Sequence, residues 1–382
     1  MSPYRGTWWA VAAAALVVNA CKDSTAPQLS NPQQLGSDLQ TVSSVFDSPA
    51  FQSFGALDSA AGSPLTASAP AGALLSATRV AAPQTPSQPY ADAPARLQAL
   101  RTAAFALGSP LSAQVIPSAV WGKTYVWDAS THQYVEDASQ FDASRHGVRV
   151  ILYAIDPFTR HVVEPAGAVG FLDLLDESAG NTNQLHVIAK GGTPASPGTT
   201  YVDYTISATV IGSPASAFSG TAVGYVSDGT RRLDFNATFS ATNLTTDNPD
   251  AQVDVHWALN SPAVTVDLHE TLATPDANHA NLSIDFSVTR GAETVSFSGT
   301  IAVVGLPPSV TADLTVSING QAFAHVSGTN DATHNGITIR HMDGSQLSQA
   351  EQQALAQLFE LPDRLEEAIQ HLFHPAEHFL GA

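Results

Sequence analysis

Apolar and polar residues alternate strictly along many segments of this chain. In one segment, Leu233 and Phe235 fall on one side of the backbone and Asp234 falls on the other. Successive side chains of a β-strand point to opposite faces, so this pattern predicts strands with one face in a core and one in water. The same alternation recurs over residues 202–210, 253–259, 282–288 and 310–318.

Short turns separate these segments, for example at Asn260-Ser261-Pro262 and Asn319-Gly320. Such spacing favours antiparallel neighbours in a meander. We count roughly 13 strands between residues 120 and 342, and open sheets of that size usually curl, split or close. The sequence therefore predicts a mainly β fold, either a large curved antiparallel meander sheet or an open barrel. Residues 148–155 are apolar on both faces and should lie centrally.

Helices are expected at both ends of the β domain. Residues 343–382 predict two short C-terminal helices, the first capped by Ser348 with Glu351 and the second opened by Pro362. We expect them to pack on the apolar face of the sheet or across one end. At the other end, Asn31 before Pro32 is typical of a helix start, and residues 35–119 read as a helical and Pro/Ala/Ser-rich region.

A weak internal repeat runs through the strands. The sequence Phe-Ser-Gly-Thr begins at Phe218 and again at Phe297, so that Gly220 and Gly299 fall on the apolar face. An inward glycine allows the sheet to bend or another element to approach. Coincidence among strands rich in Ser, Thr and Gly is the alternative.

The first 21 residues constrain where the protein is located. An apolar run from Trp8 to Val18 follows Arg5 and is too short for a transmembrane helix, so it indicates a signal peptide. The sequence Val18-Asn19-Ala20-Cys21 resembles the lipobox of bacterial lipoproteins. That resemblance implies cleavage after residue 20, a lipid on the Cys21 sulfur and a membrane-anchored mature chain, with residues 21–34 as a tether.

Lys22 follows the expected anchor. By resemblance to well-studied Gram-negative systems, a residue other than Asp at this place favours the outer membrane of the cell envelope over retention at the inner membrane. An ordinary Cys after a cleaved secretory signal is the alternative.

Composition limits the partners of the chain. It has 34 acidic and 15 basic residues, a net charge of −19, which repels nucleic acid and anionic lipid headgroups. Cys21 is the single cysteine, so no disulfide can form within the chain. The domain must be held by its core.

No catalytic motif is present. The sequence lacks the G-x-S-x-G, H-E-x-x-H, P-loop and dinucleotide-binding patterns. We therefore predict a protein that is not an enzyme and carries no cofactor, although a dispersed Ser/His/Asp triad is not excluded by sequence.

Two groups of residues are candidate sites. His371, His374 and His378 have helical spacing suited to zinc or copper, but Pro375 between them favours a solvated tail. Glu270 interrupts an apolar stripe, so a regular strand would bury it as a functional carboxylate. We favour the other interpretation, a bulge or strand end that turns Glu270 to water.

Aromatic residues cluster around the expected first hairpin, where they either pack or bind a sugar or lipid. They are Trp121, Tyr125, Trp127 and Tyr134.

These observations favour a membrane-anchored, non-enzymatic lipoprotein whose curved sheet binds a lipid or other hydrophobic small molecule. In outline this is similar to the open-barrel carriers of the Lol family, a likeness of fold only. The alternative is a structural or adhesive scaffold, in which the sheet is filled by its own helices and its outer face meets protein or glycan.

Overall fold

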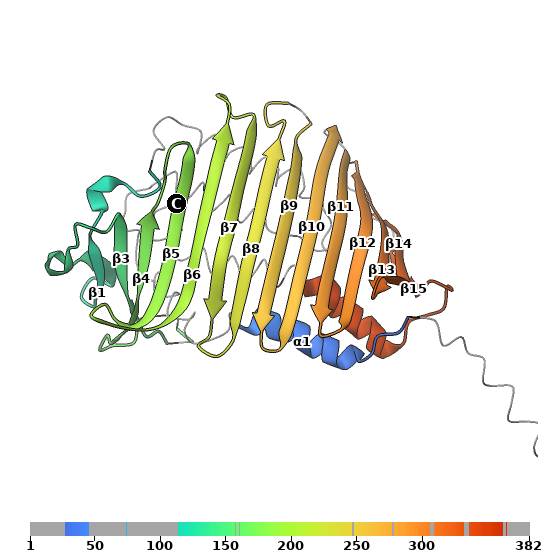
Figure 1. Cartoon of the computed structure of the whole chain (residues 1–382), viewed down its shortest axis with the longest axis horizontal. Coiled ribbons are helices and arrows are strands. Elements are labelled where there is room, and N and C mark those ends of the chain that lie inside the picture. The colour runs from blue at the N-terminus through green and yellow to red at the C-terminus, as the bar shows by residue number, and fades with distance from the viewer. Residues whose placement is uncertain are drawn as a thin grey trace, which may run out of the picture.

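A computed structural model describes residues 27–45, 74, 114–156, 158–159, 161–246, 248–276, 279–305, 309–331, 336–361 and 364. Within them, 15 strands form one sheet (Figure 1). The strands are β1 (Thr124–Asp128), β2 (Gln133–Glu136), β3 (Gly147–Tyr153), β4 (Ala168–Asp176), β5 (Thr182–Thr193), β6 (Ser196–Ile211), β7 (Ala217–Ser227), β8 (Arg232–Thr242), β9 (Asp250–Asn260), β10 (Ala263–Asp276), β11 (His279–Arg290), β12 (Glu293–Val304), β13 (Ser309–Ile318), β14 (Gln321–Asn330) and β15 (Thr338–His341).

The strands follow one another across the sheet as a meander. From β3 to β15 each strand pairs with its sequence neighbours in antiparallel fashion, because short turns leave no room for a crossover. β1 departs from the pattern, since it lies parallel to β3 and places β2 at the outer edge. With β15 at one edge and β2 at the other, the described strands form an open sheet and not a closed barrel.

Alternation along the strands separates an apolar face from a polar face, as predicted. In β11, Leu282, Ile284 and Phe286 are buried, and Ser283 and Asp285 between them are exposed. The same two-residue period holds along β5, β8, β9, β10 and β13.

Residues 148–155 correct one expectation. β3 is buried on both faces, but it is third from one edge of the sheet and not central. β3 pairs with β1 on one side and with β4 on the other. The burial of both faces of β3 was therefore not a guide to its position within the sheet.

Helix α1 (Pro32–Ser44) crosses the turn end of the strands behind the sheet (Figure 1). The Gln34 amide donates to Asn31 Oδ1 at 3.1 Å, which is the expected N-cap. Arg290 donates to Asp38 at 3.2 Å, and Arg231 donates to Ser44 at 3.0 Å. These contacts tie the helix to two separate hairpins.

The apolar stripe of α1, made of Leu35, Leu39 and Val42, is buried in the core, as is Val45 directly after the helix. Leu29 is buried as well, and the Ser30 amide donates to Glu293 at 2.8 Å. The end of the predicted tether, residues 21–34, is therefore docked on the domain.

A C-terminal helix over residues 349–361 also lies on the apolar side. The predicted capping box is confirmed, since the Ser348 amide donates to Glu351 Oε2 at 2.8 Å and the Glu351 amide donates to Ser348 Oγ at 3.3 Å. The Phe359 ring lies 4.9 Å from the Phe297 ring of β12, centroid to centroid. The second C-terminal helix expected from Pro362 lies outside the described residues, apart from Arg364.

The two Phe-Ser-Gly-Thr segments have similar surroundings. Phe218 stacks on Phe239 at 5.5 Å, and Phe297 stacks on Phe286 at 4.8 Å. A Cβ at Gly220 would overlap the Phe239 ring, and one at Gly299 (φ +151°) would overlap the backbone of the neighbouring strand. Both glycines therefore permit the close approach that the sequence suggested.

Among the described helices, none has the length and apolar character needed to cross a membrane.

Candidate functional site

Two Asp-x-His segments lie side by side on the polar face. β9 carries Asp254 and His256, and β10 carries Asp267 and His269. The antiparallel register places Asp254 opposite His269 and His256 opposite Asp267. Carboxylate and imidazole thus alternate both along and across the strands. We call these four residues the His–Asp square.

Short hydrogen bonds hold the square together. Nδ1 of His269 lies 2.6 Å from Oδ1 of Asp254, and Nδ1 of His256 lies 2.6 Å from Oδ1 of Asp267. All four side chains are between 45% and 55% exposed, so they remain accessible to a partner. Burial alone would raise the pKa of Asp254, but hydrogen bonds from His269 and Gln252 outweigh it and lower that pKa.

The flanking strands complete a shallow hollow of about 370 Å³ around the square. β8 contributes Asn236 and Thr238, and β11 contributes Asp285 and Ser287. In the register, Asp285 lies opposite His269 on the side away from Asp254. The hollow is therefore lined by three carboxylates, two imidazoles, one amide and two hydroxyls, together with Val255 and Leu268.

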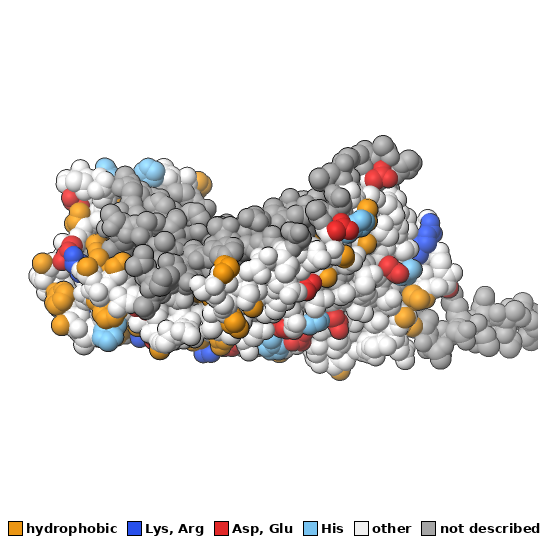
Figure 2. Space-filling model, turned by 90° about the horizontal axis from the view of Figure 1, so that it is seen from above, with side chains coloured by type: hydrophobic (Ala, Val, Ile, Leu, Met, Phe, Trp, Pro, Cys, Tyr) orange, Lys and Arg blue, Asp and Glu red, His pale blue; other side chains and the backbone are white. Residues whose placement is uncertain are grey.

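A second hollow of about 300 Å³ adjoins the first and shares Thr238 and Asp254 with it. Its lining is mostly hydroxyl: Ser207, Thr209, Ser219, Gly220, Thr221, Phe239, Ser240 and Gln252 complete it. We call the two hollows together the polar groove. It runs across the strands from β6 to β11. Figure 2 shows acidic and His side chains next to each other on the surface of the molecule.

Neither histidine of the polar groove has a hydroxyl directly opposite it on a neighbouring strand. A triad needs the imidazole between a carboxylate and a nucleophile. Across the strands, His256 lies between Asp267 and Asn236, and His269 lies between two carboxylates. In the described part of the chain, no three His, Cys, Asp or Glu side chains are grouped so as to hold a metal ion.

Other histidines also contact carboxylates on the polar face. His186 of β5 contacts Glu177 at 2.9 Å and Asp203 at 2.8 Å. Burial lowers the pKa of His186, but the two carboxylates raise it by more, and the net change is upward. Towards the other edge, His325 Nε2 contacts Asp313 Oδ1 at 2.7 Å.

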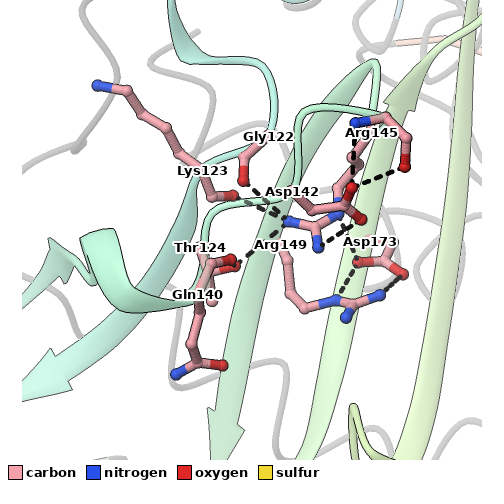
Figure 3. A network of polar contacts seen from close by, with 9 residues as sticks. Gly122, Lys123, Thr124, Gln140, Asp142, Arg145, Arg149 and Asp173 are labelled. Carbon is pink, nitrogen blue, oxygen red and sulfur yellow. Dashed lines mark hydrogen bonds and ion pairs between the residues drawn. The ribbon is translucent and has the colours of Figure 1, made fainter.

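A separate polar network lies near the β2 edge (Figure 3). Arg149 of β3 makes two hydrogen bonds of 2.7 Å to Asp173 of β4. The buried Arg145 donates to the Thr124 hydroxyl at 3.3 Å and contacts Asp142 at 3.5 Å. These partners come from β1, β3, β4 and the loop between β2 and β3, so the network ties together the elements at this end of the sheet.

Glu270 does not turn to water as the sequence analysis favoured. It is 2% exposed and keeps regular register, opposite Val253 on one side and Ile284 on the other. The shift in β10 comes later, between Ala273 and Asp276. The alternative, an inward carboxylate, is the one observed, and it lies on the face opposite the polar groove.

The predicted first hairpin is present, and its aromatic residues pack against one another. The Trp127 ring lies 5.6 Å from that of Tyr134, edge to face, and Tyr134 lies 6.4 Å from Tyr153. Trp121 is separate and stacks on His146 at 4.6 Å. Tyr125 is buried, and sugar or lipid binding by these rings stays a prediction.

The remaining predicted sites cannot be placed. Cys21 and the histidines His371, His374 and His378 lie outside the described residues. They stay predictions.

The sequence analysis missed the His–Asp square, although a signal for it exists. The pattern Asp-x-His occurs twice, at Asp254 and at Asp267, on the polar positions of two alternating segments. The turn between the two strands sets their register. Because the strands are antiparallel, the numbers of any two paired residues have the same sum, 523, as for 254 with 269 and 256 with 267. Combining the spacing with the turn would have predicted the square.

Comparison with protein-family models, with curated protein sequences and with solved structures gives no match to this chain.

Proposed function

We propose that this chain is an exported, non-enzymatic lipoprotein that binds a soluble polar partner in the polar groove. In this proposal, lipid on Cys21 holds the chain at the outer membrane and the sheet serves as a scaffold for display. The observation that carries the proposal is the polar groove, an accessible depression across six strands lined mainly by hydrogen-bonding side chains.

The apolar face supports the same choice. Helix α1 and residues 349–361 bury their apolar side chains on that side, and Phe359 packs directly on Phe297. A lipid bound there would have to displace these contacts. A hydrophobic ligand, the first expectation from sequence, is therefore the alternative that an experiment must exclude.

One substitution tests the groove whatever the partner is. Thr238 is exposed and lines both hollows, and Thr238→Tyr fills the groove with a side chain that strands accept. Thr300→Tyr, at an exposed position of β12 beyond the lining, is the matched control.

The chain and both variants are assayed for binding to immobilised cationic, neutral and acidic peptides and oligosaccharides. Native mass spectrometry with lipid extraction is run in parallel. We expect at least one soluble polymer to bind the chain and the Thr300→Tyr variant but not Thr238→Tyr. Stoichiometric lipid, with no polymer sensitive to Thr238→Tyr, would reject the proposal in favour of a carrier.

The anchor is tested separately by labelling cells with radioactive palmitate. The chain should incorporate label and Cys21→Ser should not. Equal labelling of the two would contradict lipid attachment at Cys21.

A further inference from the structure

The charge of the polar groove is unbalanced at one end. Asp254, Asp267 and Asp285 line the larger hollow, and its lining contains no Lys or Arg. Arg232, the cation of β8 on this face, contacts Asp234 and lies 3.6 Å above the Tyr225 ring, so its charge is already engaged. The larger hollow therefore has three carboxylates that no Lys or Arg of its own lining offsets.

The groove also has a direction and a length. It crosses β6 to β11, five inter-strand steps of about 4.8 Å, or about 24 Å in all. An extended peptide advances about 3.3 Å per residue, so about seven residues fill it. Hydroxyls along the second hollow can bond peptide groups, while carboxylates in the first attract cationic side chains.

The lining favours a peptide over a glycan. Phe239 is the single Phe, Tyr or Trp among the lining side chains, and it is buried. The groove therefore presents no accessible Phe, Tyr or Trp ring on which a sugar could stack.

We propose that the polar groove receives an extended polypeptide segment rich in Lys and Arg. This inference rests on the proposed function and adds the class of partner. The net charge of −19 on the whole chain favours approach of such a segment from a distance.

The test measures binding of decalysine by calorimetry at pH 7.5. The groove variant is Asp254→Asn, Asp267→Asn and Asp285→Asn together, which keeps side-chain shape. The control removes three carboxylates elsewhere, by Glu136→Gln, Asp343→Asn and Glu360→Gln. Circular dichroism verifies that both variants are folded.

Each exposed ion pair contributes roughly a factor of two, so we expect roughly tenfold weaker binding for the groove variant. The control variant should bind as the unmodified chain does. Equal weakening by both variants would overturn the inference, because it would show attraction to net charge alone.

The same assay separates this inference from the proposed function. Binding of a neutral or amino-sugar oligosaccharide that Thr238→Tyr abolishes, without decalysine binding, would reject the peptide and keep the groove. If Thr238→Tyr affects no ligand, both proposals fail.

Discussion

The contact between the C-terminal helix and the sheet decides whether the apolar face is a core or a ligand site, and it can be measured as a free energy. Phe297 of β12 is fully buried and Phe359 is 8% exposed. Their ring centroids are 4.9 Å apart, with planes at 51°, and Phe297 also stacks on Phe286. Truncation of either ring therefore leaves a cavity at the helix–sheet boundary.

The expected magnitudes follow from this geometry. Phe297→Ala should lower the free energy of unfolding by about 4 kcal/mol, and Phe359→Ala, at the edge of the cluster, by about 3 kcal/mol. The double variant should lose about 1 kcal/mol less than the sum, since the ring–ring contact is then counted once.

The assay is urea unfolding of the chain, the two single variants and the double variant, followed by circular dichroism and tryptophan fluorescence. Gln353→Ala, an exposed position on the same helix, is the control and should change stability by less than about 0.5 kcal/mol. A loss below about 1 kcal/mol for Phe359→Ala, with no coupling to Phe297, would refute the helix as a cover of the apolar face and revive a lipid in its place.

Three further predictions concern the sheet. The pKa of His186 is raised in the folded protein, so its carboxylate contacts contribute their full stabilisation below the ordinary histidine pKa, and this stabilisation is lost as the pH rises through the folded pKa. In urea unfolding, His186→Gln should therefore lower the free energy of unfolding more at pH 5.5 than at pH 8.5. The reverse order would contradict the assigned contacts. Gly299→Ala should lower the free energy of unfolding by about 2 kcal/mol, because its Cβ meets the Asp313 carbonyl at a φ that disfavours side chains; an unchanged thermal midpoint would be inconsistent with this backbone conformation. Asp173→Asn leaves Arg149 without its bidentate partner and should cost about 2 kcal/mol in the same measurement, whereas the exposed Asp313→Asn should cost little.

The sequence by itself determined the features that depend on near neighbours along the chain. Alternation assigned Leu282 and Phe286 to the core and Asp285 to water, because side-chain direction in a strand depends on local backbone geometry. Short turns predicted the antiparallel meander. Asn31 and the Ser348–Glu351 pair predicted two helix starts, since capping acts within one helical turn.

The tertiary structure decided what depends on partners distant along the chain. The parallel pairing of β1 with β3, and the place of β3 near an edge, follow from packing between strands and not from any single strand. Glu270 stays buried because regular register with Val253 and Ile284 prevails over the preference of a carboxylate for water. The His–Asp square forms through the register between β9 and β10, which depends on both strands and on the turn that joins them. The residue pattern of either strand alone does not reveal the square.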